Sequence, residues 1–380
     1  MPEQILSNAQ LVLDDEVVRG SLVIREGRIA ALDDAPSRHP AALDCGGDYL
    51  LPGLVELHTD NMEKYFQPRP KVAWPARQAA LAHDAQMAAS GITTVFDAVA
   101  IGDVSQRSMR HQTLGEMCRV IDEIVVNGLA RVDHRLHLRC EVSQAETLAR
   151  FRELADLPRL GLVSLMDHSP GQRQFVSLDA YRTYYQGKYG LSDGELEIFI
   201  ERQRESSARY SAQHRRAIAV ECHARGLALA SHDDATLAHV VESREYGTQV
   251  AEFPTTFEAA EASHRAGMVV MMGAPNVVRG GSHSGNIAAA ELVARGVLDV
   301  LSSDYYPAAL LDAVFRIARM GEGYPLPQAV ATASRVPAQA VGLDDRGRLA
   351  PGLRADLIRV RLCDDHPLVE RVWSAGRQVH

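Results

Sequence analysis

Cysteine is scarce in this sequence, and no two cysteines have the spacing of a metal-binding C-x-x-C pair. The five cysteines are an odd number and are widely scattered, at Cys45, Cys118, Cys140, Cys222 and Cys363. This distribution argues against a disulfide framework and against a cysteine zinc site. We therefore expect a reducing environment, and the cytoplasm is the compartment that fits best.

The sequence also lacks an excess of positive charge and a long uncharged apolar run. Its 49 acidic residues outnumber 40 basic ones, for a formal net charge of -9, so no global positive field would recruit nucleic acid or an anionic membrane. No uncharged stretch reaches the roughly 20 residues that a membrane-spanning helix needs, and the first residues do not resemble a signal peptide. We expect no nucleic-acid partner and no membrane contact, and a local cluster of cations must hold any phosphate-bearing ligand.

The two ends of the sequence share a strand-like pattern that the middle does not have. Residues 1–50 contain the alternating runs "AQLVLDD" and "GSLVIREGRIAAL", and residues 342–380 contain "RGRLAPGLRADLIRVRL". This pattern predicts one small β-sandwich domain that both chain ends build together. A chain of 380 residues with 46% hydrophobic content suits such a domain beside one large barrel or sheet.

Residues 51–341 contain short apolar runs that alternate with helix-length segments. The runs are "GLVELH", "TTVFDAVA", "RLHLRCEV", "LVSLMDH", "LALASH", "TQVAEF", "MVVMMGA" and "LDVLSSD". Because strands buried on both faces are almost continuously apolar, this rhythm predicts an α/β protein with a parallel (β/α)8 TIM barrel. Periodicity alone leaves a doubly wound sheet open. The rhythm is interrupted at about 169–226, a helical insertion long enough to be functional.

Imidazoles and carboxylates stand at the ends of these runs. They include His58, Asp60, Glu141, His168, His232 and Asp304. In a parallel barrel all these ends lie on one rim, where so many ionisable groups would be costly unless they were neutralised or bound to metal. One histidine in such a place is usually structural, but the set together favours one or two divalent ions such as Zn, Fe or Mn. A bound ion lowers the pKa of its water toward ~7, and Asp304 would accept the proton.

At these residues the sequence resembles the metal-dependent amidohydrolase superfamily. "LPGLVELHTD" is similar to its entry strand, and "GRLAPGLRADLIRVR" is similar to its exit into a small β-sandwich. The resemblance implies a distorted (β/α)8 barrel. This chain has His58-Thr59-Asp60 where most members have His-x-His, and Glu141 where many have a carboxylated lysine. The implied metal ligands are His58, Asp60, Glu141, His168, His232 and Asp304.

Seven further strings resemble one branch of that superfamily, the diphosphatases of the carbon–phosphorus lyase pathway. They are "ELHTDNMEKYFQPRPKVAWPA", "SLMDHSPGQRQF", "YYQGKY", "ASHDDAT", "EFPTTFEAAEAS", "MGAPNVVRGGSHSGN" and "LSSDYYPA". The resemblance implies a phosphoanhydride hydrolase of phosphonate catabolism. Its small-molecule substrate would be a ribose 5-triphosphate, which loses pyrophosphate and keeps a 5-phosphate.

A triphosphate needs cations, and the loops beside the strands supply them. The candidates are Arg69, Lys71, Arg173, Lys188 and Arg279, whose charged groups suit phosphate oxygens. Tyr185 and neighbouring tyrosines of the insertion would cover the ribose and the phosphates. Asp304 would act as general base, and His283 would either protonate the leaving pyrophosphate or hydrogen-bond a phosphate.

Two other functions remain open at this level. One is an amidohydrolase that acts on a cyclic amide or an N-acyl group, which the cationic and glycine-rich elements near the rim disfavour. The other is a catalytically silent scaffold, which the nearly complete ligand set disfavours. A homodimer is compatible with this class of barrel, but no heptad or exposed apolar run in the sequence argues for it.

Overall fold

The computed structural model describes residues 2–69, 72–102, 109–175, 177–282, 285–321 and 324–380, without the side chains of residues 109–112, 180 and 188. The chain forms two compact units. Unit 1 comprises Met1–Asp97, Arg119–Arg135 and Met272–His380, and unit 2 comprises Ala98–Cys118 and Leu136–Met271.

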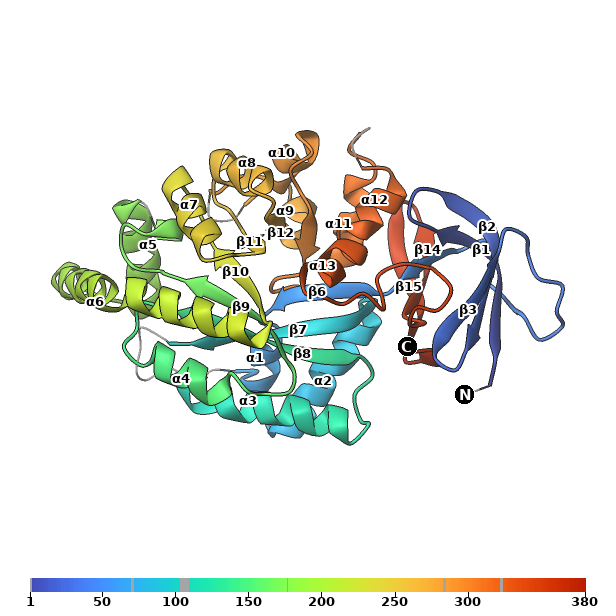
Figure 1. Ribbon diagram of the computed structural model, residues 1–380, viewed down its shortest axis with the longest axis horizontal. Helices are drawn as coiled ribbons and strands as arrows, with labels where there is room; N and C mark the ends of the chain where they lie inside the picture. Colours follow the sequence, from blue (N-terminus) through green and yellow to red (C-terminus); the bar gives the residue numbers. More distant parts are fainter. Residues whose placement is uncertain (1, 70–71, 103–108, 176, 283–284, 322–323) are drawn as a thin grey trace. The chain divides into compact units, whose positions relative to one another are not determined.

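Both ends of the chain contribute to one mostly antiparallel sheet of unit 1 (Figure 1). Its strands, in the order β16-β15-β14-β5-β1-β2-β3 with β4 beside β1, are β1 (Gln4–Val12), β2 (Val17–Arg25), β3 (Arg28–Asp33), β4 (Leu43–Asp44), β5 (Tyr49–Pro52), β14 (Leu357–Cys363), β15 (His366–Ser374) and β16 (Arg377–Gln378). The two halves meet where Ile358 pairs with Leu51 in antiparallel register. The apolar core of the sheet includes Leu22, Leu50 and Trp373. The predicted contribution of both termini to one β structure is confirmed.

A second sheet contains eight strands in sequence order, from β6 to β13. They are β6 (Leu54–Thr59), β7 (Ile92–Ile101), β8 (Asp133–Glu141), β9 (Leu160–Met166), β10 (Ala228–His232), β11 (Val250–Glu252), β12 (Val269–Gly273) and β13 (Val300–Ser302). The pairs β6–β7, β8–β9, β9–β10, β10–β11 and β11–β12 are parallel. Sequential parallel strands separated by helices are the pattern of a (β/α)8 barrel. The eight apolar runs coincide with these strands, which confirms the predicted fold class.

The first and last barrel strands are tied together in unit 1. Thr59, the last residue of β6, forms a parallel bridge with Asp304, and its Oγ1 donates a hydrogen bond to the Asp304 carbonyl at 2.7 Å. Below them the fully buried Glu56 accepts hydrogen bonds from the hydroxyl of Ser302 and the backbone N–H of His58. Burial raises the pKa of Glu56 to about 7, although these hydrogen bonds oppose the shift. The carboxyl ends of β6 and β13 are therefore held side by side.

Helices follow the barrel strands in both units. Unit 1 contains α1 (Met62–Phe66), α2 (Ala76–Ala89), α9 (Ala274–Arg279), α10 (Ala289–Ala294), α11 (Ala309–Ile317), α12 (Leu326–Ala331) and α13 (Arg335–Ala340). Unit 2 contains α4 (Thr147–Leu154), the 3-10 turn η1 (Arg173–Phe175), α5 (Leu178–Tyr189), α6 (Asp193–Arg225), α7 (Leu237–Glu245) and α8 (Phe257–Arg265), and α3 (Met109–Val126) contributes to both. No helix of the described residues is long and apolar enough to cross a membrane.

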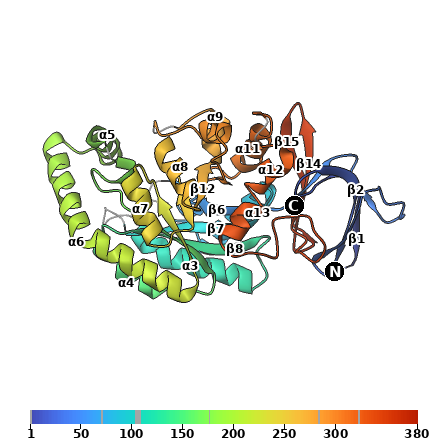
Figure 2. The same ribbon diagram turned by 45° about the horizontal axis from the view of Figure 1, so that its top comes forward.

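The long helix α6 dominates the stretch predicted as an insertion. A capping box between Ser192 and Glu195 starts it, and Gly226 ends it in the left-handed conformation at a φ of 66°, which glycine adopts without steric cost. The helix packs against α4 and α5 in unit 2 (Figure 2). Helices α5 and α6 both fall within 169–226, while the domain boundaries themselves stay a prediction.

Candidate active site

Two imidazoles and a carboxylate of unit 2 converge at the ends of β9 and β10. His168 follows β9, His232 ends β10, and Asp233 comes next. The Nε2 atoms of His168 and His232 lie 3.6 and 3.4 Å from the same oxygen, Oδ2 of Asp233. Two ligand atoms that each lie ~2.1 Å from a tetrahedral ion are roughly 3.4 Å apart. The spacing and the donor types of these three side chains fit one divalent cation.

Two further carboxylates hold the other edges of these imidazoles. Nδ1 of His168 lies 2.7 Å from Oε2 of Glu141, and Nδ1 of His232 lies 3.0 Å from Oε2 of Glu252. Each carboxylate can accept a proton from Nδ1, an arrangement that directs Nε2 toward a cation, as outer carboxylates do in metal sites. Burial favours the neutral imidazole of His168, but the charges of Glu141 and Asp233 outweigh this and raise its pKa to about 9.

The predicted ligand set contains His232 but neither Asp233 nor Glu252. Asp233 adopts a left-handed conformation with a φ of 57°, and its backbone N–H donates to the carbonyl of Glu252 at 2.9 Å. This backbone conformation is strained for a residue other than glycine. The conformation places the Asp233 side chain beside the two imidazoles. The available sequence signal was a carboxylate at the end of an apolar run, in "ALASHDD" and in "TQVAEF".

Glu141 contacts His168 in this structure. Its second oxygen, Oε1, accepts a hydrogen bond from the hydroxyl of Ser143 at 2.7 Å. Both oxygens therefore have partners within unit 2, so Glu141 positions His168. Its predicted role as a direct, bridging metal ligand stays a prediction.

The remaining predicted ligands, His58, Asp60 and Asp304, belong to unit 1. His58 is buried within β6, Asp60 follows the strand, and Asp304 follows β13 with a φ of 53°. The bridge between Thr59 and Asp304 places the ends of the two strands side by side. Three groups of the types that bind hard or borderline divalent cations thus come from adjacent strand ends.

Helix α6 anchors the strand end that carries His168. Asp167, just before His168, is buried, and its Oδ2 accepts hydrogen bonds from Ser211 at 2.8 Å and from Arg215 at 3.2 Å. Burial would raise the pKa of Asp167, but the charge of Arg215 and these hydrogen bonds lower it instead. Arg215 also contacts Glu242 of α7 at 3.3 Å. Helix α6 of the predicted insertion thereby holds the strand end that carries the predicted metal ligand His168.

The predicted substrate-binding residues have different environments. Arg69 and Arg279 are exposed, and Nη1 of Arg279 lies 3.5 Å from the hydroxyl of Tyr305. The side chain of Arg173 is only 2% exposed and is paired with Asp234 and Glu242, so its charge is neutralised within unit 2.

Tyr185 is buried among aromatic rings, with its centroid 4.4 Å from that of Tyr181. Substrate contact by Arg173 and Tyr185 stays a prediction. Lys71 and His283 lie outside the described residues, as does the side chain of Lys188.

Lys64 is a cation that sequence reasoning did not single out. It lies on α1, four residues after Asp60, and its Nζ contacts the carbonyl oxygen of Tyr305. The same ammonium group lies 5.7 Å from the centroid of the Tyr305 ring, within the range of a cation–π interaction. Lys64 thus lies beside the segment that follows Asp304. Its signal in the sequence was a lone basic residue soon after a strand-end carboxylate.

Comparisons with known proteins agree with this architecture. The model of the amidohydrolase family matches residues 67–380. The alpha-D-ribose 1-methylphosphonate 5-triphosphate diphosphatase of Escherichia coli (strain K12) is 55% identical over 376 residues, which cover 99% of this chain and 100% of that protein. This relative bears out the resemblance to the diphosphatases of the carbon–phosphorus lyase pathway.

Solved structures share the fold at low identity. An amidohydrolase crystal structure has a TM-score of 0.65 and 17% identity over 99% of this chain and 98% of its own. The N-acetylglucosamine-6-phosphate deacetylase from Pasteurella multocida has a TM-score of 0.60 and 12% identity over 99% of both chains. The family match, the relative and the barrel with candidate metal-binding groups at its strand ends all lead to one assignment. The chain belongs to the amidohydrolase family.

Proposed function

We propose that this protein is a metal-dependent hydrolase that releases pyrophosphate from α-D-ribose 1-methylphosphonate 5-triphosphate and leaves the 5-phosphate, in phosphonate catabolism. The observation that carries the proposal is the 55% identity, over nearly the whole length of both chains, with a diphosphatase named for this substrate. The cations beside the strand ends support it, because a triphosphate requires positive partners.

The strand-end residues would hold one or two divalent ions, of which Zn, Fe or Mn suit the donor set. His168, His232 and Asp233 would bind one ion, with Glu141 and Glu252 orienting the imidazoles. We assign His58, Asp60 and Asp304 to a second ion, because carboxyl ends of parallel barrel strands face one rim. A bound divalent ion polarises a phosphoryl oxygen and lowers the pKa of a bound water.

The reaction needs a group that accepts the proton of the attacking water. Water attacks one phosphorus in line, a P–O bond to the leaving pyrophosphate breaks, and Asp304 takes the proton. The hydrogen bond from Thr59 and one from the Asp304 N–H to the Ser302 hydroxyl, at 3.2 Å, fix the backbone of this base. His283 would either protonate the leaving pyrophosphate or hydrogen-bond a phosphate.

Cations of the loops would bind the phosphate chain. Arg69, Lys71, Lys188 and Arg279 are the proposed phosphate ligands, joined by Lys64. Arg173 and Tyr185 would act indirectly, Arg173 by holding Asp234 and Tyr185 by packing the aromatic cluster of α5.

The proposal includes a cytoplasmic location. It is supported by the five cysteines, all within the described residues, between which no disulfide forms. A homodimer is compatible with the fold.

The decisive experiment is phosphorus NMR of the triphosphate with metal-reconstituted protein in oxygen-18 water. We expect pyrophosphate and a 5-monophosphate, and the position of the label identifies the phosphorus that was attacked. The matched control is Asp304→Asn, which should retain the fold and lose turnover. If the substrate stays intact while metal analysis confirms a loaded protein, and a cyclic amide or N-acyl compound is cleaved instead, the proposal is wrong.

A further inference from the structure

Four titratable side chains of unit 1 are completely buried away from the strand-end residues of the proposed reaction. They are His83 and Asp84 on α2, Asp97 on β7 and His134 on β8, and the exposed fraction of each is 0%. Burying a charged group costs several kcal/mol unless neighbouring groups neutralise it. This cost is comparable with the whole free energy of unfolding of a domain. Their presence between α2 and the strands β7 and β8 therefore calls for a role.

The four side chains form one hydrogen-bonded chain. Nε2 of His83 lies 2.6 Å from Oδ1 of Asp97, whose Oδ2 lies 2.7 Å from Nδ1 of His134. Nε2 of His134 lies 3.3 Å from Oδ1 of Asp84. The two shortest separations are those of charge-assisted hydrogen bonds, whereas two ligands of a tetrahedral ion would stand roughly 3.4 Å apart. The geometry favours shared protons over a metal ion.

The middle of this chain is an ion pair. Burial favours a neutral His134, but the charge of Asp97 and the hydrogen bond to Asp84 raise its pKa to about 9. Burial would raise the pKa of Asp97, but the charge of His134 and the contact with His83 lower it to about 2. At neutral pH an imidazolium thus lies between two carboxylates, and the guanidinium of Arg131, which contacts Asp84, offsets the remaining negative charge.

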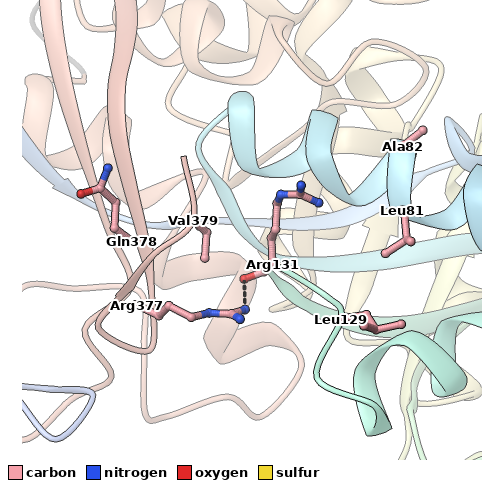
Figure 3. Close-up of a pocket in the computed structure, with 7 residues that line it drawn as sticks. All are labelled: Leu81, Ala82, Leu129, Arg131, Arg377, Gln378 and Val379. Carbon is pink, nitrogen blue, oxygen red and sulfur yellow. Dashed lines mark hydrogen bonds between the residues drawn. The ribbon is translucent and has the colours of Figure 1, made fainter. Parts of the chain in front are cut away.

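The outer end of the chain is anchored near the surface. Asp84 accepts hydrogen bonds from the backbone N–H of Arg131 at 2.7 Å and from its guanidinium at 2.9 Å. Arg131 lines a surface hollow together with Leu81, Leu129 and Arg377 (Figure 3). The backbone next to Arg131 is also fixed, because the guanidinium of Arg377 donates a hydrogen bond to the carbonyl of Ala130 at 2.6 Å.

The inner end of the chain reaches the loop that carries the predicted metal ligand Asp60. The side-chain amide of the buried Asn61 donates to Nδ1 of His83 at 3.2 Å, so Nε2 is the nitrogen that donates to Asp97. Asn61 directly follows Asp60, and its Oδ1 lies 3.5 Å from Nζ of Lys64. That ammonium group also contacts the carbonyl of Tyr305, the residue after Asp304.

We propose that His83, Asp97 and His134 form a positioning relay that holds Asn61, and through Asn61 keeps Asp60 in place beside the Asp304 segment. The relay touches neither substrate nor metal, so its members are positioning residues. An aligned imidazolium between two carboxylates fixes the tautomer and orientation of His83, as outer carboxylates do for metal-bound histidines. The inference rests on the proposed function for its kinetic test, but not for its spectroscopic one.

The test is a double-mutant cycle between the two ends of the relay, with His83→Ala, Asn61→Ala and the double variant. Each single variant should lower kcat about 10- to 100-fold with a small change in KM, because the loss of an outer-shell partner has this size. The double variant should lose no more than the stronger single one, because both changes remove the same restraint. Losses that multiply, or a lower melting temperature with kcat unchanged, would overturn the proposal.

A conservative replacement and a control complete the kinetic test. His83→Gln can accept from Asn61 and donate to Asp97, so it should recover most of the lost kcat and keeps the test open if His83→Ala does not fold. His39→Gln is the matched control, because it replaces an exposed histidine of unit 1 that lies outside the relay. It should behave like the wild type.

The absorption spectrum of cobalt-substituted protein gives a readout without substrate. A relay that positions Asp60 predicts a changed visible spectrum and weaker cobalt binding in His83→Ala and Asn61→Ala, and wild-type behaviour in His39→Gln. An unchanged spectrum in both His83→Ala and Asn61→Ala would contradict the proposed relay, even if the protein hydrolyses the triphosphate. A changed spectrum in a protein that does not hydrolyse the triphosphate would support the relay and refute the proposed substrate.

Discussion

Nδ1 of His168 lies 2.7 Å from Oε2 of Glu141, and Nε2 of the same imidazole faces Asp233 at 3.6 Å. The ring is held on one edge and offers its other edge to a cation. We infer that this relationship prepares His168 as a metal ligand, with Glu141 as the base that orients it.

Glu141→Gln tests that role. The amide keeps the size of the side chain but loses the charge that orients His168, so we expect metal affinity to fall about 10- to 100-fold. Equilibrium dialysis with metal analysis measures it, and Glu153→Gln, an exposed change on α4, is the control. Complete loss of one equivalent of metal would instead identify Glu141 as a direct ligand, and unchanged affinity would contradict both roles.

Asp233→Asn tests the ligand that the sequence did not identify. Asparagine tolerates the left-handed backbone, so the fold should persist while one metal equivalent is lost or weakened by at least about tenfold. The measurements are metal stoichiometry and circular dichroism. Asp364→Asn, at an exposed position with a φ of 47°, is the matched control. Retention of full stoichiometry at low free metal would exclude Asp233 from the site.

The buried relay predicts a specific pH dependence of stability. The raised pKa of His134 means that its stabilisation is fully present below 6.5 and is lost as the pH rises through about 9. The lowered pKa of Asp97 means that its stabilisation is fully present above 3.8 and is lost as the pH falls through about 2. The relay should therefore stabilise unit 1 most between roughly pH 4 and 6.5.

Denaturant unfolding of the wild type and His134→Gln at several pH values measures this dependence. The difference in unfolding free energy between the two proteins should be largest below pH 6.5 and should shrink toward pH 9. His366→Gln, an exposed histidine of β15, should show no such trend. A difference that is constant from pH 5 to 9 would mean that His134 is not a buried imidazolium.

The ion pair between Arg215 and Asp167 should matter for both stability and the site. Arg215→Met leaves Asp167 buried without its cation, so we expect a loss of about 3 kcal/mol in unfolding free energy. The double variant Asp167→Asn/Arg215→Met should recover much of it, because no unpaired charge stays buried. Denaturant melts decide the first point, and Arg216→Met, one residue further on α6, is the control. Recovery of stability without recovery of metal affinity would show that Asp167 also positions His168.

The eight apolar runs predicted the barrel because a strand covered on both faces must be apolar along its length, a property of local sequence. The same logic placed His58, Glu141, His168, His232 and Asp304 at strand ends. The alternating pattern of both termini predicted their common sheet for a similar reason. These features depend on periodicity over a few residues, which the chain carries within each segment.

Side-chain partners between distant segments were not accessible in this way. Nothing in the sequence pairs Glu141 with His168, buries Arg173 against Asp234, or links Asn61 through His83, Asp97 and His134 to Arg131. In the sequence, Asp97 is one of several carboxylates near strand ends, and no pattern distinguishes His83 or His134.

The sequence by itself determined the barrel, the terminal sheet, the family and the type of chemistry at the strand ends. Only the tertiary structure decided which of those groups lie close enough to share a cation, which contact the imidazoles and which are withdrawn into ion pairs. The physical reason is that apolar periodicity acts along the chain, whereas hydrogen bonds and charge pairing form between atoms whose distance depends on the packing of many elements.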